Sequence, residues 1–167
     1  MGYEKTTTRL GIRRATPDDA DFFLRLLNSE GWLRYIGDRH VHSPEEAREY
    51  IENRILPQYD YPGHGSYLIA LRETDVPLGF VGVFRRDTLP APDFGFAFLP
   101  EGQGRGYARE ASVALLATPE INNLPELLAI VLPENLRSIR LLEALGFWPY
   151  GTVRLSDDLE LLKYRRV

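Results

Sequence analysis

The sequence predicts an α/β fold of the α+β kind, with a mixed, mostly antiparallel, twisted sheet of about seven strands flanked by about four helices. Runs rich in β-branched and aromatic residues alternate with segments whose apolar residues recur at helical spacing, in the order β-α-α-β-β-β-α-β-α-β-β. The 167 residues contain no internal repeat or linker, so residues 1–167 are expected to form a single domain.

The first strand is expected over residues 10–15, and two helices should follow it. Thr16-Pro17-Asp18-Asp19 supplies an N-cap residue, a proline at the first helical position and acids in the first turn. Ser43-Pro44-Glu45-Glu46 repeats these signals as a capping box. Apolar residues follow both starts at helical spacing: Ala20, Phe23, Leu24 and Leu27, and then Ala47, Tyr50, Ile51 and Ile55.

Three further strands are expected in the middle of the chain, over residues 66–71, 78–85 and 93–99. Their connections are short and contain proline, which favours antiparallel pairing. The next helix should begin at Tyr107 and end before Pro119. The remaining elements are a strand over residues 127–132, a helix from Asn135 to Gly146, and strands over residues 147–153 and 159–165.

Composition excludes several classes of protein. With no cysteine, the chain has no disulfide, no thiolate metal site and no cysteine nucleophile. A net charge of −4 argues against a general nucleic-acid binder. The chain shows neither a bilayer-spanning apolar stretch nor the apolar core of a signal peptide, so a cytoplasmic enzyme without membrane contact is expected. Its three histidines show no recognised metal spacing, so no metal is expected.

A glycine-rich segment, Pro100-Glu-Gly-Gln-Gly-Arg-Gly-Tyr-Ala-Arg-Glu-Ala111, leads from a strand into a helix. Such glycines let backbone N–H groups converge at a helix start, which suits a pyrophosphate. A Walker loop would need Lys and then Ser or Thr where Tyr107-Ala108 stands. A dinucleotide fingerprint fails because Arg109 stands at its last position. The alternative is a glycine-rich turn without a ligand.

A second segment, Pro133-Glu-Asn-Leu-Arg-Ser-Ile-Arg-Leu-Leu-Glu-Ala-Leu-Gly-Phe147, follows the next strand. Together the two segments resemble the GNAT superfamily of N-acetyltransferases, in particular its Rim-type branch, which acetylates ribosomal-protein N-termini and related amines. The first matches Gln-Gly-x-Gly-Tyr-Ala-x-Glu-Ala and the second matches Pro-x-Asn-x-x-Ser-x-Arg-x-Leu-Glu-x-Leu-Gly-Phe. Weaker resemblance extends from Leu10 to about Tyr164.

The resemblance implies acetyl-CoA as cosubstrate and an amine as acceptor. The pantetheine arm should pair with the backbone of a strand that diverges from its neighbour, the pyrophosphate should lie on the glycine segment, and Asn135 should help to fix the pantetheine. The implied cofactor-binding residues are Phe96, Ala97, Phe98, Leu99, Gln103, Gly104, Arg105, Gly106, Tyr107, Ala108, Asn135 and Ser138.

Two catalytic residues are expected. By resemblance Asp93 is the candidate general base, because the branch commonly carries an acidic residue at this strand start in Glu-x-Gly form. Strand alternation places Asp93 on one face with Gly95 and Ala97, where small residues leave room for a ligand. The alternative for Asp93 is an exposed carboxylate at a strand start. By resemblance, Ser138 lies near the sulfur as a proton donor to the leaving thiolate; Leu142 occupies the position where many superfamily members carry a tyrosine acid. Asn135 and Ser138 also suit a plain helix start.

The acceptor is less defined. Trp32, Tyr35 and His40 are expected to line its wall, with packing between two helices as the alternative for Trp32 and Tyr35. The first acceptor candidate is a peptide or protein N-terminal α-amine, and the second is a small molecule such as an aminoglycoside, polyamine or amino acid. A non-catalytic acyl-CoA-binding regulatory domain is a third hypothesis. The sequence leaves the oligomeric state open, a homodimer included.

Overall fold

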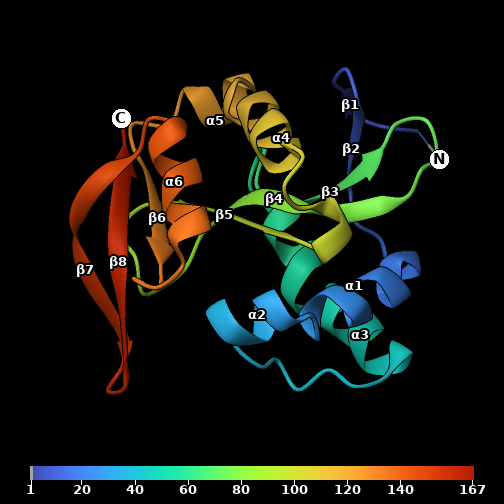
Figure 1. Cartoon of the computed structure of the whole chain (residues 1–167), viewed down its shortest axis with the longest axis horizontal. Coiled ribbons are helices and arrows are strands. Elements are labelled where there is room, and N and C mark those ends of the chain that lie inside the picture. Colours follow the sequence, from blue (N-terminus) through green and yellow to red (C-terminus); the bar gives the residue numbers. More distant parts are fainter. Residues whose placement is uncertain (1) are drawn as a thin grey trace.

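A computed structural model describes residues 2–167 as one eight-stranded sheet with helices on both faces (Figure 1). The strand order is β1-β2-β3-β4-β5-β6-β8-β7, and every neighbouring pair except β5 with β6 is antiparallel. The strands are β1 (Lys5–Thr6), β2 (Leu10–Arg14), β3 (Gly65–Leu71), β4 (Pro77–Phe84), β5 (Asp93–Phe98), β6 (Leu127–Val131), β7 (Trp148–Ser156) and β8 (Leu159–Arg166). The predicted fold class is therefore confirmed.

The helices form two layers that cover opposite faces of the sheet (Figure 1). The first layer is α1 (Ala20–Leu27), α2 (Glu30–Tyr35) and α3 (Pro44–Tyr50), which continues into a π-helical turn (Ile51–Ile55). The second layer is α4 (Tyr107–Leu116), α5 (Pro119–Asn122) and α6 (Leu136–Ala144). Each layer buries its own hydrophobic cluster against the sheet, so the sheet is covered on both faces.

The helix starts follow the capping signals of the sequence. Thr16 forms a capping box with Asp19, and the Ser43 hydroxyl accepts a hydrogen bond from the Glu46 N–H at 3.1 Å. Asn135 caps α6, because its side chain accepts from the Ser138 N–H at 3.3 Å. No helix among the described residues is long and apolar enough to span a membrane.

Three elements of the structure are absent from the prediction. Strand β1 has only two residues, both polar and exposed, and is defined by its pairing with β2 rather than by an apolar pattern. Helices α2 and α5 have six and four residues, which is too short for a helical period to be recognised.

The break in the sheet between β5 and β6 positions the site. These strands are parallel and share a single register pair, Asp93 with Leu128, among the described residues. Strand β5 instead pairs with β4 along its whole length, and β6 pairs with β8. Beyond Asp93 the two strands therefore diverge, which is the arrangement that the resemblance implies.

Candidate active site

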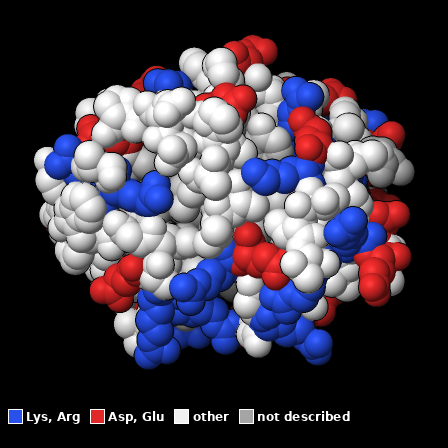
Figure 2. All heavy atoms as spheres, turned by 90° about the horizontal axis from the view of Figure 1, so that it is seen from above, with Lys and Arg blue, Asp and Glu red and all other residues white. Residues whose placement is uncertain are grey.

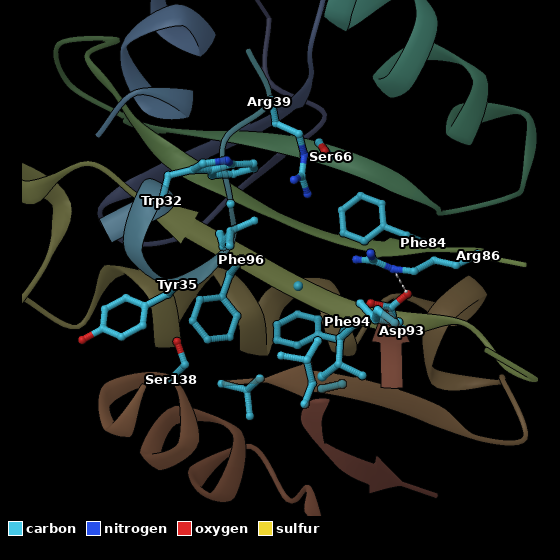
Figure 3. A pocket seen from close by; sticks show the side chains of 18 of the residues that line it. Trp32, Tyr35, Arg39, Ser66, Phe84, Arg86, Asp93, Phe94, Phe96 and Ser138 are labelled. Atoms are coloured by element: carbon cyan, nitrogen blue, oxygen red, sulfur yellow. Dashed lines mark hydrogen bonds and ion pairs between the residues drawn. The ribbon is translucent and has the colours of Figure 1, made fainter. Parts of the chain in front are cut away.

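A cavity of about 880 Å³ lies where β5 and β6 diverge (Figure 3). This volume is within the range of small-ligand sites, about 300–1,000 Å³. Strands β5 and β6 and the start of α6 form one wall, and α2, the segment after it and the end of β4 contribute to the other. Six of the predicted site residues meet here: Trp32, Tyr35, Asp93, Phe96, Asn135 and Ser138.

Asp93 lies at the closed end of the cleft and is only 1% exposed. Its Oδ1 accepts a hydrogen bond from Arg86 Nε at 2.9 Å, the ion pair drawn in Figure 3. Burial raises the pKa of Asp93 above its ordinary value, and the charge and hydrogen bond of Arg86 offset this only in part. The alternative of an exposed carboxylate at a strand start is wrong, because the pairing of β5 with both neighbours encloses this position.

The two faces of β5 follow the predicted alternation. Phe94 and Phe98 belong to the core beneath the α4–α6 layer, and Phe96 packs against it. Ala97 packs with the α1–α3 cluster, so Gly95 and Asp93, two and four residues before it, share its face. Both faces contribute to the cavity: Asp93 and Gly95 line it from the side of the first helix layer, and Phe94 and Phe96 line it from the other.

The backbone of β5 has a free edge toward the cleft. The Leu99 N–H donates to the Leu78 carbonyl at 2.8 Å, on the β4 side. Since backbone groups of successive residues point to opposite sides of a strand, those of Phe96 and Phe98 point toward β6. No strand pairs with them among residues 2–167, and the Phe98 carbonyl accepts from the Gln103 side chain at 2.9 Å. An extended ligand could therefore hydrogen-bond here as an added strand.

Ser138 and Asn135 border the cavity at the start of α6. The Ser138 hydroxyl points into the cavity in Figure 3 and makes no hydrogen bond within the described chain. Leu142, one turn further along α6, is buried and lines the same cavity. The hydroxyl of Ser138 is therefore free to donate to a ligand, and Leu142 offers no acid.

The glycine segment forms a nest of free amides at the start of α4. Gly104 and Gly106 adopt φ values of 76° and 78°, the left-handed region that glycine tolerates. The N–H groups of residues 104–108 make no hydrogen bond to any described residue, and the α4 N-cap, Gly106, supplies no side chain. Several donors and the positive end of the helix dipole thus face outward, as in anion sites at helix starts.

Two side chains hold this segment in place, and only one was predicted to matter. Arg9, which sequence reasoning missed, donates to the Arg105 carbonyl at 2.8 Å, pairs with Glu110 and lies over the Tyr107 ring. Gln103 was expected to bind the cofactor. Its side-chain amide donates to the Phe98 carbonyl at 2.9 Å and accepts from Arg137 at 2.6 Å, so it bridges β5 and α6.

Two of the three residues expected to line the acceptor wall border the cavity. These are Trp32 and Tyr35, and Trp32 also packs against Phe80 of β4 in the core. The structure does not place His40 among the lining residues. Its side chain is 81% exposed beside Asp38, at a left-handed backbone position with φ of 56°.

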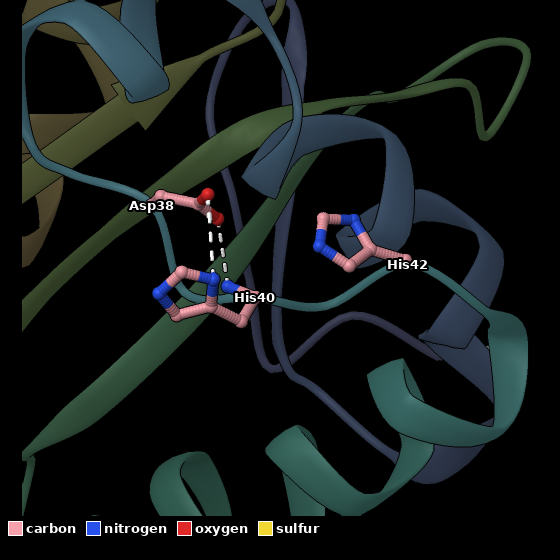
Figure 4. Close-up of side chains that lie close together, drawn as sticks. All are labelled: Asp38, His40 and His42. Atoms are coloured by element: carbon pink, nitrogen blue, oxygen red, sulfur yellow. Dashed lines mark hydrogen bonds and ion pairs between the residues drawn. The ribbon is translucent and has the colours of Figure 1, made fainter.

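Asp38, His40 and His42 form a separate surface cluster (Figure 4). One potential ligand atom from each residue lies within 4.8 Å of the others, so the fold places the Asp38 carboxylate beside two of the three histidines. All three are exposed, and three ligands leave a structural zinc site incomplete. None of these three residues lines the cavity between β5 and β6.

Together, the divergent strands, the free strand edge and the amide nest define an enzyme that transfers an acyl group from coenzyme A. Residues 9–148 match the acetyltransferase (GNAT) domain, and the chain belongs to this family of acetyl-CoA-dependent N-acetyltransferases. The chain is 27% identical over 143 residues to the uncharacterized N-acetyltransferase YnaD of Bacillus subtilis, covering 84% of this chain and 80% of YnaD.

Solved structures agree on the fold. An acetyltransferase from Agrobacterium tumefaciens is 28% identical, with a TM-score of 0.80 and coverage of 98% of this chain and 93% of that one. RimL, a ribosomal L7/L12 α-N-protein acetyltransferase in complex with coenzyme A, is 19% identical with a TM-score of 0.78, at 98% and 96% coverage. Spermidine N-acetyltransferase from Vibrio cholerae, in complex with CoA and spermine, is 20% identical with a TM-score of 0.75, at 96% and 96% coverage. At these identities the last two share the fold alone.

Proposed function

We propose that this enzyme transfers the acetyl group of acetyl-CoA to an α-amine by direct attack in a ternary complex, with Asp93 as the general base. The observation that carries the proposal is the buried Asp93 carboxylate at the closed end of the cleft. The pantetheine would lie along the free edge of β5, and the pyrophosphate on the amides of residues 104–108. All of these residues come from one chain, so the proposal requires no homodimer.

The raised pKa of Asp93 suits a base that must take a proton from an ammonium group. At pH 7 an α-amine with a pKa near 8 is about one-tenth deprotonated, whereas a lysine-like amine near 10.4 is free in only about one molecule in 2,500. An α-amine therefore needs less help with deprotonation from a carboxylate base than a lysine-like amine does. This favours α-amines over polyamines and lysine side chains as acceptors.

Proton supply to the leaving group is the second requirement. Ser138 is the candidate donor, since its hydroxyl is unpaired and points into the cavity. A CoA thiol with a pKa near that of free cysteine, about 8.5, is already a tolerable leaving group. The leucine at position 142 is therefore compatible with turnover.

Two sources of α-amine fit. A peptide or protein N-terminus is the acceptor that the Rim-type resemblance suggests. A small α-amine, such as an amino acid, is favoured by the volume of the cavity, which matches small-ligand sites.

An acceptor screen tests the proposal. The enzyme would be incubated with acetyl-CoA and either peptides with free N-termini, the same peptides with blocked N-termini and one lysine, amino acids, or spermidine, and the products identified by mass spectrometry. We expect acetylation of α-amines in the first and third groups. Acetylation confined to lysine or spermidine would overturn the α-amine assignment. An absence of amine-stimulated CoA release with every acceptor would favour the non-catalytic hypothesis instead.

A further inference from the structure

The cavity carries positive charge although the chain as a whole is acidic. Its lining contains five arginines and two aspartates, and no lysine, glutamate or histidine among the described residues, which gives it a formal charge of +3. The whole chain has a net charge of −4. Charge is also uneven on the outer surface, where Lys and Arg side chains gather along the lower edge of the face in Figure 2. A cleft lined by one sign of charge attracts ligands of the opposite sign.

Four of the five arginines have no carboxylate partner in the described chain: Arg34, Arg39, Arg54 and Arg85. Each instead lies over an aromatic ring, with the guanidinium carbon between 5.1 and 5.8 Å from the ring centroid. Stacking holds a guanidinium group in place while its N–H donors stay available. The fifth arginine, Arg86, is paired with Asp93.

Arg39 and Trp32 provide a more specific signal. The guanidinium group of Arg39 lies over the Trp32 ring, and both residues line the cavity. Arg39 Nε and Trp32 Nε1 are both buried, and neither finds an acceptor among residues 2–167. Both groups can only donate. Buried donors normally have partners, so two orphan donors beside one cavity indicate a ligand that brings acceptor atoms.

Arg39 and Arg86 approach the cavity from different walls. In Figure 3 the guanidinium groups of both point into it, and Arg86 bonds to Asp93 at 2.9 Å. An ammonium beside Asp93 and an acid beside the two arginines would satisfy this arrangement. Because Arg86 and Asp93 are adjacent, the two charges on the ligand must be adjacent as well.

These arginines are distinct from the site expected for the phosphates of CoA. They come from α2, the segment after it, the π-helical turn and the segment after β4, whereas residues 104–108 do not line the cavity. We therefore expect the positive charge of the cavity to face the acceptor rather than the phosphates of CoA.

We propose that Arg39, with Arg86, forms an anion subsite that selects acceptors carrying a carboxylate close to the reacting α-amine. This inference rests on the proposed function and names its substrate class. The shared chemistry fits either a free α-amino acid or a peptide that begins with aspartate or glutamate.

Matched acceptors test the subsite. The values of kcat/KM would be compared within two pairs. The first pair is peptides that begin with Glu or Gln, and the second is free glutamine and its α-amide, which lacks the α-carboxylate. We expect the wild type to prefer the acid member by at least about 10-fold, since a charge-assisted hydrogen bond is typically worth about 10- to 100-fold. A preference among peptides alone identifies a chain terminus as the source, and one among amino acids alone identifies a free metabolite.

The variant Arg39→Gln should lower kcat/KM for the acid member by about 10- to 100-fold and leave the neutral member within about 3-fold. Arg48 is an exposed arginine on α3 that does not line the cavity. Arg48→Gln is therefore the control and should change neither value. Equal use of both acceptors by the wild type, or an equal loss for both in Arg39→Gln, would overturn the subsite.

Binding separates this inference from the proposed function. Calorimetry of the acid and neutral members of both pairs with the enzyme–CoA complex requires no turnover. Tighter binding of an acid member that is lost in Arg39→Gln supports the subsite even if no acceptor is acetylated. Equal affinities within both pairs in the wild type contradict it even if acetylation occurs.

Discussion

Asp93 pairs with Leu128 at the one point where β5 and β6 remain in register among the described residues, so the candidate base lies where the cleft closes. A ligand that extends along β5 would thus reach from the amide nest at the start of α4 toward this carboxylate. The strand pairing at which this divergence begins buries Asp93, and burial raises its pKa. Cofactor binding and base strength therefore depend on one feature of the sheet.

The amide nest predicts the effect of side chains at Gly104. Gly104→Val should lower CoA affinity strongly, because a branched side chain at a φ of 76° distorts the loop and projects where the pyrophosphate would lie. Gly151→Val is a matched control, since Gly151 has a φ of 89° and, like Gly104, no atom within 4 Å of an added Cβ. Both variants should lose about 1–3 kcal/mol of stability. In calorimetry only Gly104→Val should lose affinity, and undiminished affinity would remove the pyrophosphate from this loop.

Ser138→Ala should lower kcat by roughly 10-fold. This is less than the factor of about 10²–10⁴ that general acid catalysis typically contributes, because the CoA thiol leaves readily without a proton donor. CoA affinity should change little, since the proposed role arises only as the thiolate departs. Steady-state kinetics combined with calorimetry measure the two effects. An unchanged kcat would leave Ser138 as a residue of the helix start and assign the proton to water.

The arrangement of Asp93 also predicts a pH dependence of stability. The folded state raises the pKa of this carboxyl, so between the unfolded and folded values the folded state binds more protons. Stability from this group is therefore present below about pH 4 and is lost as pH rises through the folded pKa, by about 1.4 kcal/mol for each tenfold change in the acid dissociation constant.

Asp93→Asn removes this dependence. In urea unfolding, the stability of the variant relative to the wild type should increase as pH rises from about 4 to 7. The substitution leaves Arg86 unpaired, but that side chain is 40% exposed and stays hydrated. A difference in unfolding free energy between the variant and the wild type that does not vary with pH would show that burial does not raise the pKa of Asp93.

Local signals predicted much of the fold. The caps at Thr16, Ser43 and Asn135 occur where the sequence places them, and so does the glycine-rich start of α4. Such motifs act through contacts within a few residues, which is why they can be recognised in one sequence. The two-residue strand β1 could not be recognised from the sequence, because it depends on pairing with β2.

The electrostatics of the site could not be predicted from local signals. Arg39, Arg54 and Arg86 lie in separate segments, and only the fold gathers them around one cavity. Arg9 contacts Glu110 from a position 101 residues away. The burial of Asp93 follows from its neighbours in the sheet rather than from its own sequence. Long-range convergence of this kind leaves no pattern in the chain.

The pH–rate profile of Asp93→Asn tests the central claim most directly. General-base assistance is typically worth about 10²–10⁴ in rate, so with an α-amine acceptor the variant should lose roughly that factor in kcat at pH 7. The loss should shrink as pH rises, because solvent then supplies more of the free amine. Urea unfolding of the variant at pH 7 separates a loss of catalysis from unfolding. Full activity of Asp93→Asn at neutral pH would contradict the account and place the base elsewhere.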